Sequence, residues 1–194
     1  MNETCHLAEH LTRFRQNKED LPDDFLESCE ELGNKLQSWR FESENMTSFH
    51  GSGDFRMAVF SQQAQAWHAA TLVYYYTCIE DVGRADLILE VDHTAAYIQV
   101  AEDIKSTPEA VGEGESMAPI TWPAFIASCN ATSDRRDVWK RNWERMLCYQ
   151  LENVGNQWEI VQQIWKILDA AESQGKYLSW TEAYGMVGIN ILPV

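Results

Sequence analysis

Residues 54–81 read DFRMAVFSQQAQAWHAATLVYYYTCIED, and this stretch decides the fold. Its apolar side chains recur every three or four positions, which is the period of one face of an α-helix. They are Phe55, Val59, Trp67, Ala70, Val73 and Tyr74. Around residues 74–76 the helix is apolar on more than one face. Because a helix that is apolar on several sides is buried on several sides, we expect this one at the centre of the fold.

The same helical period continues on both sides of this stretch. It predicts helices over residues 7–14, 22–39, 85–105, 134–150 and 157–172. Capping boxes, in which a polar N-cap residue pairs with a glutamate three positions later, are expected at Asn156 with Glu159 and at Ser179 with Glu182. No stretch alternates as a strand does. We therefore predict an all-α fold, a single irregular multi-helix bundle of roughly six to eight helices.

Two polar stretches separate the predicted helices. Residues 42–53 and residues 106–118 contain glycine, serine and glutamate without a helical period, which is typical of loops. We expect residues 1–53 to form N-terminal helices followed by a polar loop. Residues 54–194 would then form the main helical domain, with residues 106–118 as its internal loop.

The composition narrows the classes of partner. The chain has 194 residues, of which 30 are acidic and 15 are basic, so its net charge is −15. Proteins that bind bare nucleic acid replace its counterions with clustered cations. This charge therefore argues against direct contact with nucleic acid and with anionic membranes. The most apolar stretch, residues 69–76, is also much shorter than the roughly 20 residues of a membrane span.

One basic cluster stands out against this acidic background. It lies in the predicted helix over residues 134–150 and comprises Arg135, Arg136, Lys140, Arg141 and Arg145. A helix that reads DNA could carry such a pattern. Acidic residues are interspersed among the cations, however, which favours a solvated helix face with internal ion pairs. A surface for an acidic partner protein is the intermediate interpretation.

Two short motifs could bind metal ions. His6 and His10 match the H-x-x-E-H pattern of a class of zinc proteases, and two histidines four apart share a helix face. Asp23, Asp24 and Glu27 resemble an acidic magnesium-binding box found in terpene synthases. The motif around His6 stands at the start of the chain, where helices fray, and carboxylates in a first helical turn stabilise the helix dipole. We therefore favour structural roles for both motifs.

Eight tryptophans are the most unusual compositional feature. Most of them fall on the apolar stripes, where large aromatic side chains anchor helix packing. A helical core rich in tryptophan could also enclose a cavity for a small molecule. The sequence leaves both interpretations open.

The segment ITWPAFIASCNA at residues 120–131 resembles a known family signature, W-P-x-F-I-A-G-C-x-A. That signature is found in the fungal-specific transcription factor domain, the regulatory domain of zinc-cluster transcription factors, and the closest subgroup contains regulators of arginine and GABA metabolism. Four further segments resemble the family in the same order, at residues 65–76, 134–146, 160–169 and 180–192. The matching signature residues are Trp122, Pro123, Phe125, Ile126, Ala127, Cys129 and Ala131.

The resemblance implies an all-α regulatory domain in the nucleus that has no enzymatic activity and no cofactor. Its partners would be proteins of the transcription machinery or co-regulators, a second copy of the chain could form a homodimer, and a metabolite could act as effector. The signature residues would be structural, and the basic helix would be a surface for a partner. The alternatives are a small all-α enzyme or ligand-binding protein with an aromatic pocket, and a stand-alone adaptor.

The sequence departs from the family at three points. Ser128 replaces the glycine of the signature, and Thr77 and Cys78 stand where arginines are common. The zinc-cluster module that reads DNA needs six cysteines in two C-x2-C-x6-C-like runs, which the five scattered cysteines do not provide. We therefore expect either one piece of a longer gene product or a stand-alone relative without that module.

Overall fold

The computed structural model describes residues 2–17, 21–41, 54–112 and 117–188. The regular structure of these residues is entirely helical, which confirms the predicted all-α fold. Its α-helices are α1 (Asn2–Asn17), α2 (Asp23–Ser38), α3 (Asp54–Cys78), α4 (Ile88–Lys105), α5 (Pro108–Gly112), α6 (Thr121–Cys129), α7 (Arg136–Leu147), α8 (Glu152–Ser173) and α9 (Trp180–Val187). Two 3₁₀-helices, η2 (Arg84–Leu87) and η3 (Ser133–Arg135), precede α4 and α7.

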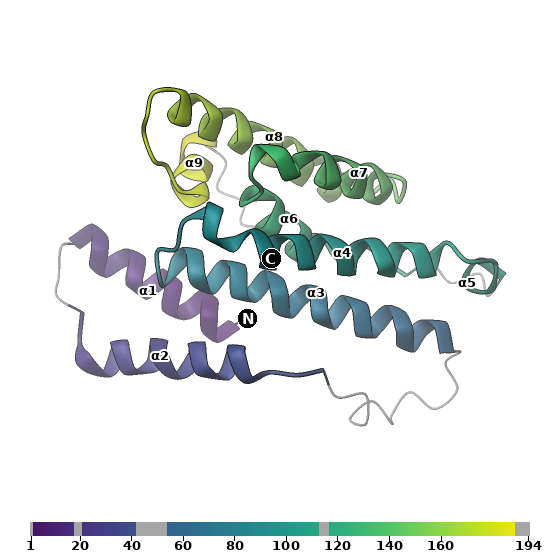
Figure 1. The fold of residues 1–194 in the computed structure, drawn as a ribbon, viewed down its shortest axis with the longest axis horizontal. Coiled ribbons are helices and arrows are strands. Elements are labelled where there is room, and N and C mark those ends of the chain that lie inside the picture. The colour runs from purple at the N-terminus through teal and green to yellow at the C-terminus, as the bar shows by residue number, and fades with distance from the viewer. Residues whose placement is uncertain (1, 18–20, 42–53, 113–116, 189–194) are drawn as a thin grey trace.

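Helix α3 is the central element, as its several apolar faces predicted. It contacts α1 and α2 on one side and α4, α5 and α6 on the other, and Figure 1 shows it between these two groups. It ends at Cys78, because the chain turns at Asp81 through a left-handed conformation with φ of 57°. Aspartate is among the few residues other than glycine that adopt this conformation readily.

Two differences from the sequence prediction concern the loop before α6 and the start of α8. The predicted loop over residues 106–118 contains the short helix α5, which begins at Pro108 and has the Thr107 hydroxyl 3.4 Å from the amide nitrogen of Ala110. Proline fits the first position of a helix because the amide there has no partner within the helix. Helix α8 begins at Glu152, so the capping box predicted at Asn156 is wrong and this residue lies inside the helix.

The second predicted capping box is confirmed at the start of α9. The Ser179 hydroxyl accepts a hydrogen bond from the Glu182 amide at 3.3 Å, and the Glu182 carboxylate accepts one from the Ser179 amide at 2.8 Å. Both contacts are local, so a four-residue motif is enough to specify them.

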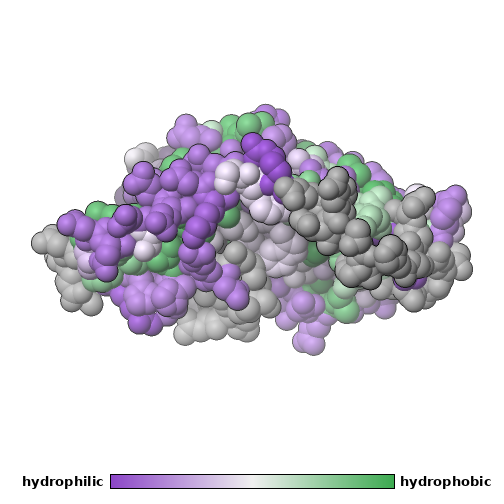
Figure 2. Space-filling model, turned by 90° about the horizontal axis from the view of Figure 1, so that it is seen from below, coloured by the Kyte–Doolittle hydropathy of each residue, from purple (hydrophilic) through white to green (hydrophobic). Residues whose placement is uncertain are grey.

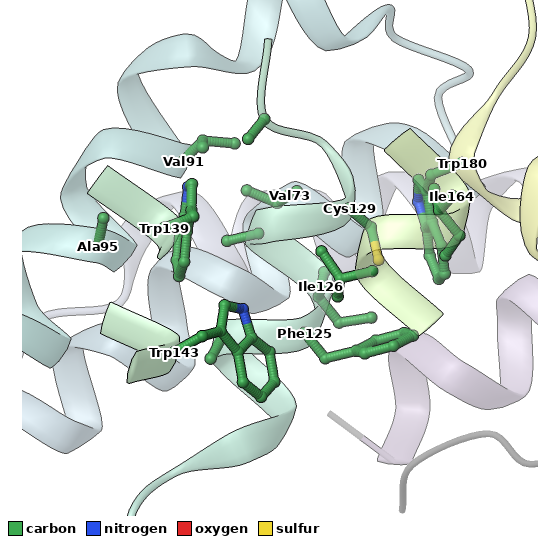
Figure 3. Close-up of a cluster of buried hydrophobic side chains, with 14 of the residues drawn as sticks. Val73, Val91, Ala95, Phe125, Ile126, Cys129, Trp139, Trp143, Ile164 and Trp180 are labelled. Carbon is green, nitrogen blue, oxygen red and sulfur yellow. The ribbon is translucent and has the colours of Figure 1, made fainter. Parts of the chain in front are cut away.

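The main core joins α3, α4, α6, α7, α8 and α9. Trp139 and Trp143 enter it from α7, Phe125 and Ile126 come from α6, and all four are almost completely buried (Figure 3). A second cluster forms where α1 and α2 pack on the other side of α3. It contains Leu7, Ala8, Leu11, Cys29, Leu32, Tyr75 and Ile79. The domain boundary placed after residue 53 stays a prediction.

Candidate functional site

The family signature forms helix α6, which lies in the main core. Phe125, Ala127, Cys129 and Ala131 have no exposed surface, Ile126 is 2% exposed, and Pro123 is buried. Trp122 is only partly buried and stacks on Trp67 of α3 with ring centroids 5.0 Å apart. The signature therefore places one tryptophan at the edge of the core and most of its other side chains inside.

Ser128 connects α6 to two tryptophans of the core. Its hydroxyl lies 3.3 Å from the indole nitrogen of Trp143, and its carbonyl oxygen accepts a hydrogen bond of 2.7 Å from the indole of Trp165. The same hydroxyl donates to the carbonyl of Phe125 at 3.2 Å. Because these groups are buried, losing one partner leaves an unsatisfied polar group in the core.

Replacing Ser128 with alanine is expected to lower the free energy of unfolding by about 1–3 kcal/mol, because the Trp143 indole loses its acceptor in a buried site. Urea denaturation of the variant measures the loss. In a Trp143→Phe background, where no indole needs that acceptor, the same replacement should cost clearly less. An equal loss in both backgrounds would show that this hydrogen bond contributes nothing.

The basic cluster is largely occupied by contacts within the chain. Arg136 is buried and forms two hydrogen bonds of 2.6 and 2.7 Å with the carboxylate of Asp169 on α8. Its guanidinium carbon lies 5.0 Å from the ring centroid of Trp165. The other contacts are Arg145 with Asp103 at 2.7 Å, Lys140 with Asp137 at 2.7 Å and Arg135 with Asp92 at 3.5 Å. Lys140 and Arg141 are the exposed members of the cluster.

The Arg136–Asp169 pair makes stability depend on pH. The hydrogen bonds from Arg136 lower the pKa of the Asp169 carboxyl below its ordinary value of 3.8. A carboxyl whose pKa is lower in the folded state stabilises the fold above its unfolded pKa, and this contribution is lost as the pH falls through the folded pKa. Wild type should therefore lose stability below about pH 4 more steeply than Asp169→Asn, as urea denaturation between pH 3 and 6 would show. Identical pH profiles would contradict this role, and Asp23→Asn in the exposed first turn of α2 serves as the control.

The two metal motifs lie on α1 and α2. The rings of His6 and His10 are 4.5 Å apart on α1, and Asp23, Asp24 and Glu27 are exposed in the first turns of α2. Within the described residues, no three histidine, cysteine or acidic side chains lie close enough together to hold a metal ion. Among those residues there is also no helix with the length and apolar character that crossing a bilayer requires.

A groove between α2 and α3, which we call the α2–α3 groove, was not anticipated from the sequence. Its volume is about 380 Å³. It is lined by Leu11, Leu21, Phe25, Leu26, Cys29, Glu30, Gly33, Asn34, Gln37, Tyr75, Tyr76, Ile79 and Glu80. The spacing of residues 25, 26, 29, 30, 33, 34 and 37 along one side of α2 could have suggested a continuous face, but not the helix opposite it.

A close helix contact forms the floor of this groove. A side chain at Gly33 would collide with the hydroxyl of Tyr75, so glycine lets α2 approach α3 at this point. The Tyr75 hydroxyl lies 2.7 Å from the Glu80 carboxylate and 3.0 Å from the carbonyl oxygen of Cys29. Burial and the hydrogen bond to Glu80 both raise the pKa of Tyr75.

A second set of contacts holds the C-terminal end of α2. The Nε2 atom of His68 on α3 lies 2.7 Å from the carbonyl oxygen of Leu36. The His68 ring also stacks on Trp39, with centroids 4.4 Å apart. The Gln37 amide donates a hydrogen bond of 3.2 Å to the Tyr76 hydroxyl. The groove therefore has one wall, α2, that is attached to the central helix near its middle and at its end.

Comparison with known proteins gives a match to a family model. The family model of the fungal-specific transcription factor domain matches residues 1–192, so the match includes α1 and α2 as well as the signature helix. Comparison with curated proteins and with solved structures finds no match to the chain. Since the family model covers nearly all of the sequence, the chain belongs to the family of the fungal-specific transcription factor domain.

Proposed function

We propose that this chain is a nuclear transcription-regulatory domain that acts through contacts with other proteins and does not itself contact DNA. Membership of the family supports a role in transcription regulation. The main support for the proposal is that most of the basic cluster forms ion pairs within the chain. Each of Arg135, Arg136, Lys140 and Arg145 pairs with a carboxylate of the same chain.

These pairs leave little cationic surface for a nucleic acid. A phosphate backbone would have to compete with carboxylates already 2.6 to 3.5 Å from those side chains, on a chain of net charge −15. Proteins of the transcription machinery and co-regulators are therefore the partners that we propose. The proposal assigns no reaction and no cofactor to the chain.

The ion pairs within the chain decide which residues of α7 can be mutated to test for a partner surface. Charge reversal at Arg136 would break the buried contact with Asp169 and so affect the fold itself. Lys140 and Arg141 are exposed, so reversing their charges tests a partner surface with less effect on the fold. If α7 binds an acidic partner, Lys140→Glu combined with Arg141→Glu should remove the binding.

A tethered reporter tests the proposal. The chain is fused to an unrelated DNA-binding module, and transcription is measured from a promoter that carries the module's site. We expect a change of several fold, in either direction, relative to the module alone. A Trp143→Ala fusion controls for folding, because it removes a fully buried side chain. No change by the folded chain would contradict the proposal.

A further inference from the structure

We propose that the α2–α3 groove is the docking site for a basic amphipathic helix of a partner protein. This inference rests on the proposed function, because it identifies the kind of protein that the regulatory domain contacts. Three properties of the groove support it: its length, its exposed apolar side chains and the charge of its rim.

The length of the groove fits a helix. On α2 its lining extends from Phe25 to Gln37, which is three helical turns or roughly 18 Å at 1.5 Å per residue. Opposite these residues, the second wall is formed by Tyr75 and Tyr76 at the end of α3 and by Ile79 and Glu80 in the turn that follows it. A groove that follows one side of α2 over three turns suits side chains that recur every three or four residues along one face of a bound helix.

The lining of the groove includes apolar side chains that are exposed to solvent. Leu26 is 48% exposed although it projects from a helix that packs on the core, and Phe25, Leu21 and Tyr76 are partly exposed beside it. Exposed apolar side chains gathered in a concave surface mark sites where another molecule binds. The apolar face of an amphipathic helix would cover these side chains.

The acidic side chains around the groove favour a basic partner. The lining contains two carboxylates, Glu30 and Glu80, and no basic side chain, and every residue of this lining lies in the described part of the chain. The exposed side of α2 adds further acidic side chains, Asp23, Asp24, Glu27 and Glu31. Lys35 of the same helix is directed to Glu3 of α1, at 3.6 Å.

The surface on this side of the molecule mixes polar and apolar side chains. Figure 2 views the molecule from the side on which α2 lies and shows hydrophilic surface with hydrophobic patches between. A helix with an apolar face flanked by lysine and arginine complements both features, because opposite charges around an apolar contact favour the correct partner and speed its association.

The test uses a synthetic peptide as probe. It has about 15 residues, with leucine every third or fourth position and lysine or arginine elsewhere. Its binding to the full chain is followed by fluorescence anisotropy. We expect saturable binding that weakens as salt is added, because salt screens the charges on the rim. A peptide of the same composition with the leucine period scrambled, and one with glutamate in place of every cation, should not bind.

Matched variants of the chain locate the binding. Glu30→Lys, which reverses a charge in the groove, should weaken binding about tenfold or more. Glu31→Lys makes the same change on the neighbouring residue of α2, which does not line the groove, and should have a much smaller effect. Leu26→Ser should weaken binding, whereas Leu89→Ser on α4 should not, although Leu89 is 61% exposed. Circular dichroism confirms that each variant is folded.

The outcomes separate this inference from the proposed function. Absence of peptide binding, equal binding of the scrambled peptide, or equal effects of Glu30→Lys and Glu31→Lys would overturn the groove as the docking site. If the tethered reporter still responds in that case, the proposed function stands without the groove. A groove occupied by a second copy of the chain would appear in analytical ultracentrifugation as a dimer that Glu30→Lys dissociates, and this result would also overturn the inference.

Discussion

Replacement of Trp143 by alanine is expected to lower the free energy of unfolding by about 3–5 kcal/mol, which is typical of a buried tryptophan. The side chain has no exposed surface and stacks on Trp158 with ring centroids 5.7 Å apart. Its truncation would open a cavity between α7, α6 and α8 and remove the hydrogen bond to Ser128. Chemical denaturation followed by circular dichroism measures the loss.

An exposed aromatic residue provides the matched control. Tyr177 is 66% exposed, so Tyr177→Ala should change stability by no more than about 0.5 kcal/mol. If the two replacements cost the same, Trp143 does not occupy the centre of the core, and the arrangement of α7 against α6 is wrong.

The second large effect is expected at a buried charge cluster. Glu102 is 5% exposed, and its carboxylate accepts hydrogen bonds of 2.6 Å from Lys105 and 2.7 Å from the Tyr149 hydroxyl. Lys105 also donates to the carbonyl oxygen of Ala118, so the cluster joins α4 to the segments before α6 and after α7. Burial and the hydrogen bond to Glu102 raise the pKa of Tyr149.

Replacing Glu102 with alanine should lower the free energy of unfolding by about 3–5 kcal/mol, because it leaves the buried ammonium of Lys105 without its counter-ion. The double replacement of Glu102 and Lys105 by methionine should recover most of this loss, since no unpaired charge is then buried. Urea denaturation compares the two variants. A double variant as unstable as Glu102→Ala would show that the charge imbalance is not the cause.

Local sequence patterns predicted the helices and helix ends that are specified by residues close together in the chain. The apolar faces of α3 were sufficient to place it at the centre, and the motif of Ser179 and Glu182 specified the start of α9. The start of α8 was missed because Asn156 and Glu159 fit the capping-box pattern as well as Ser179 and Glu182 do. Helix α5 was missed because threonine, proline and glycine are signals of both loops and helix ends.

Local sequence patterns did not predict the contacts between residues that are far apart in the chain. Arg136 and Asp169 are 33 residues apart, so the sequence could suggest ion pairs on α7 but not the partner on α8. The groove depends on the approach of Gly33 to Tyr75, and nothing in the pattern of α2 reveals which residue of α3 it meets. The segments that resemble the family lie between residues 65 and 192, whereas the family model extends the match to α1 and α2.

We propose that this regulatory domain works through contacts with proteins, whereas most basic side chains of its basic cluster pair with carboxylates of the same chain. Fluorescence anisotropy of a labelled random-sequence DNA duplex, titrated with the full chain at near-physiological salt, tests this proposal. Non-specific DNA binding by proteins typically has a Kd of about 10⁻⁴–10⁻⁶ M, so the titration should reach that range. We predict no saturable binding. Salt-dependent binding in that range, lost when Lys140 and Arg141 are both replaced by glutamate, would contradict the account.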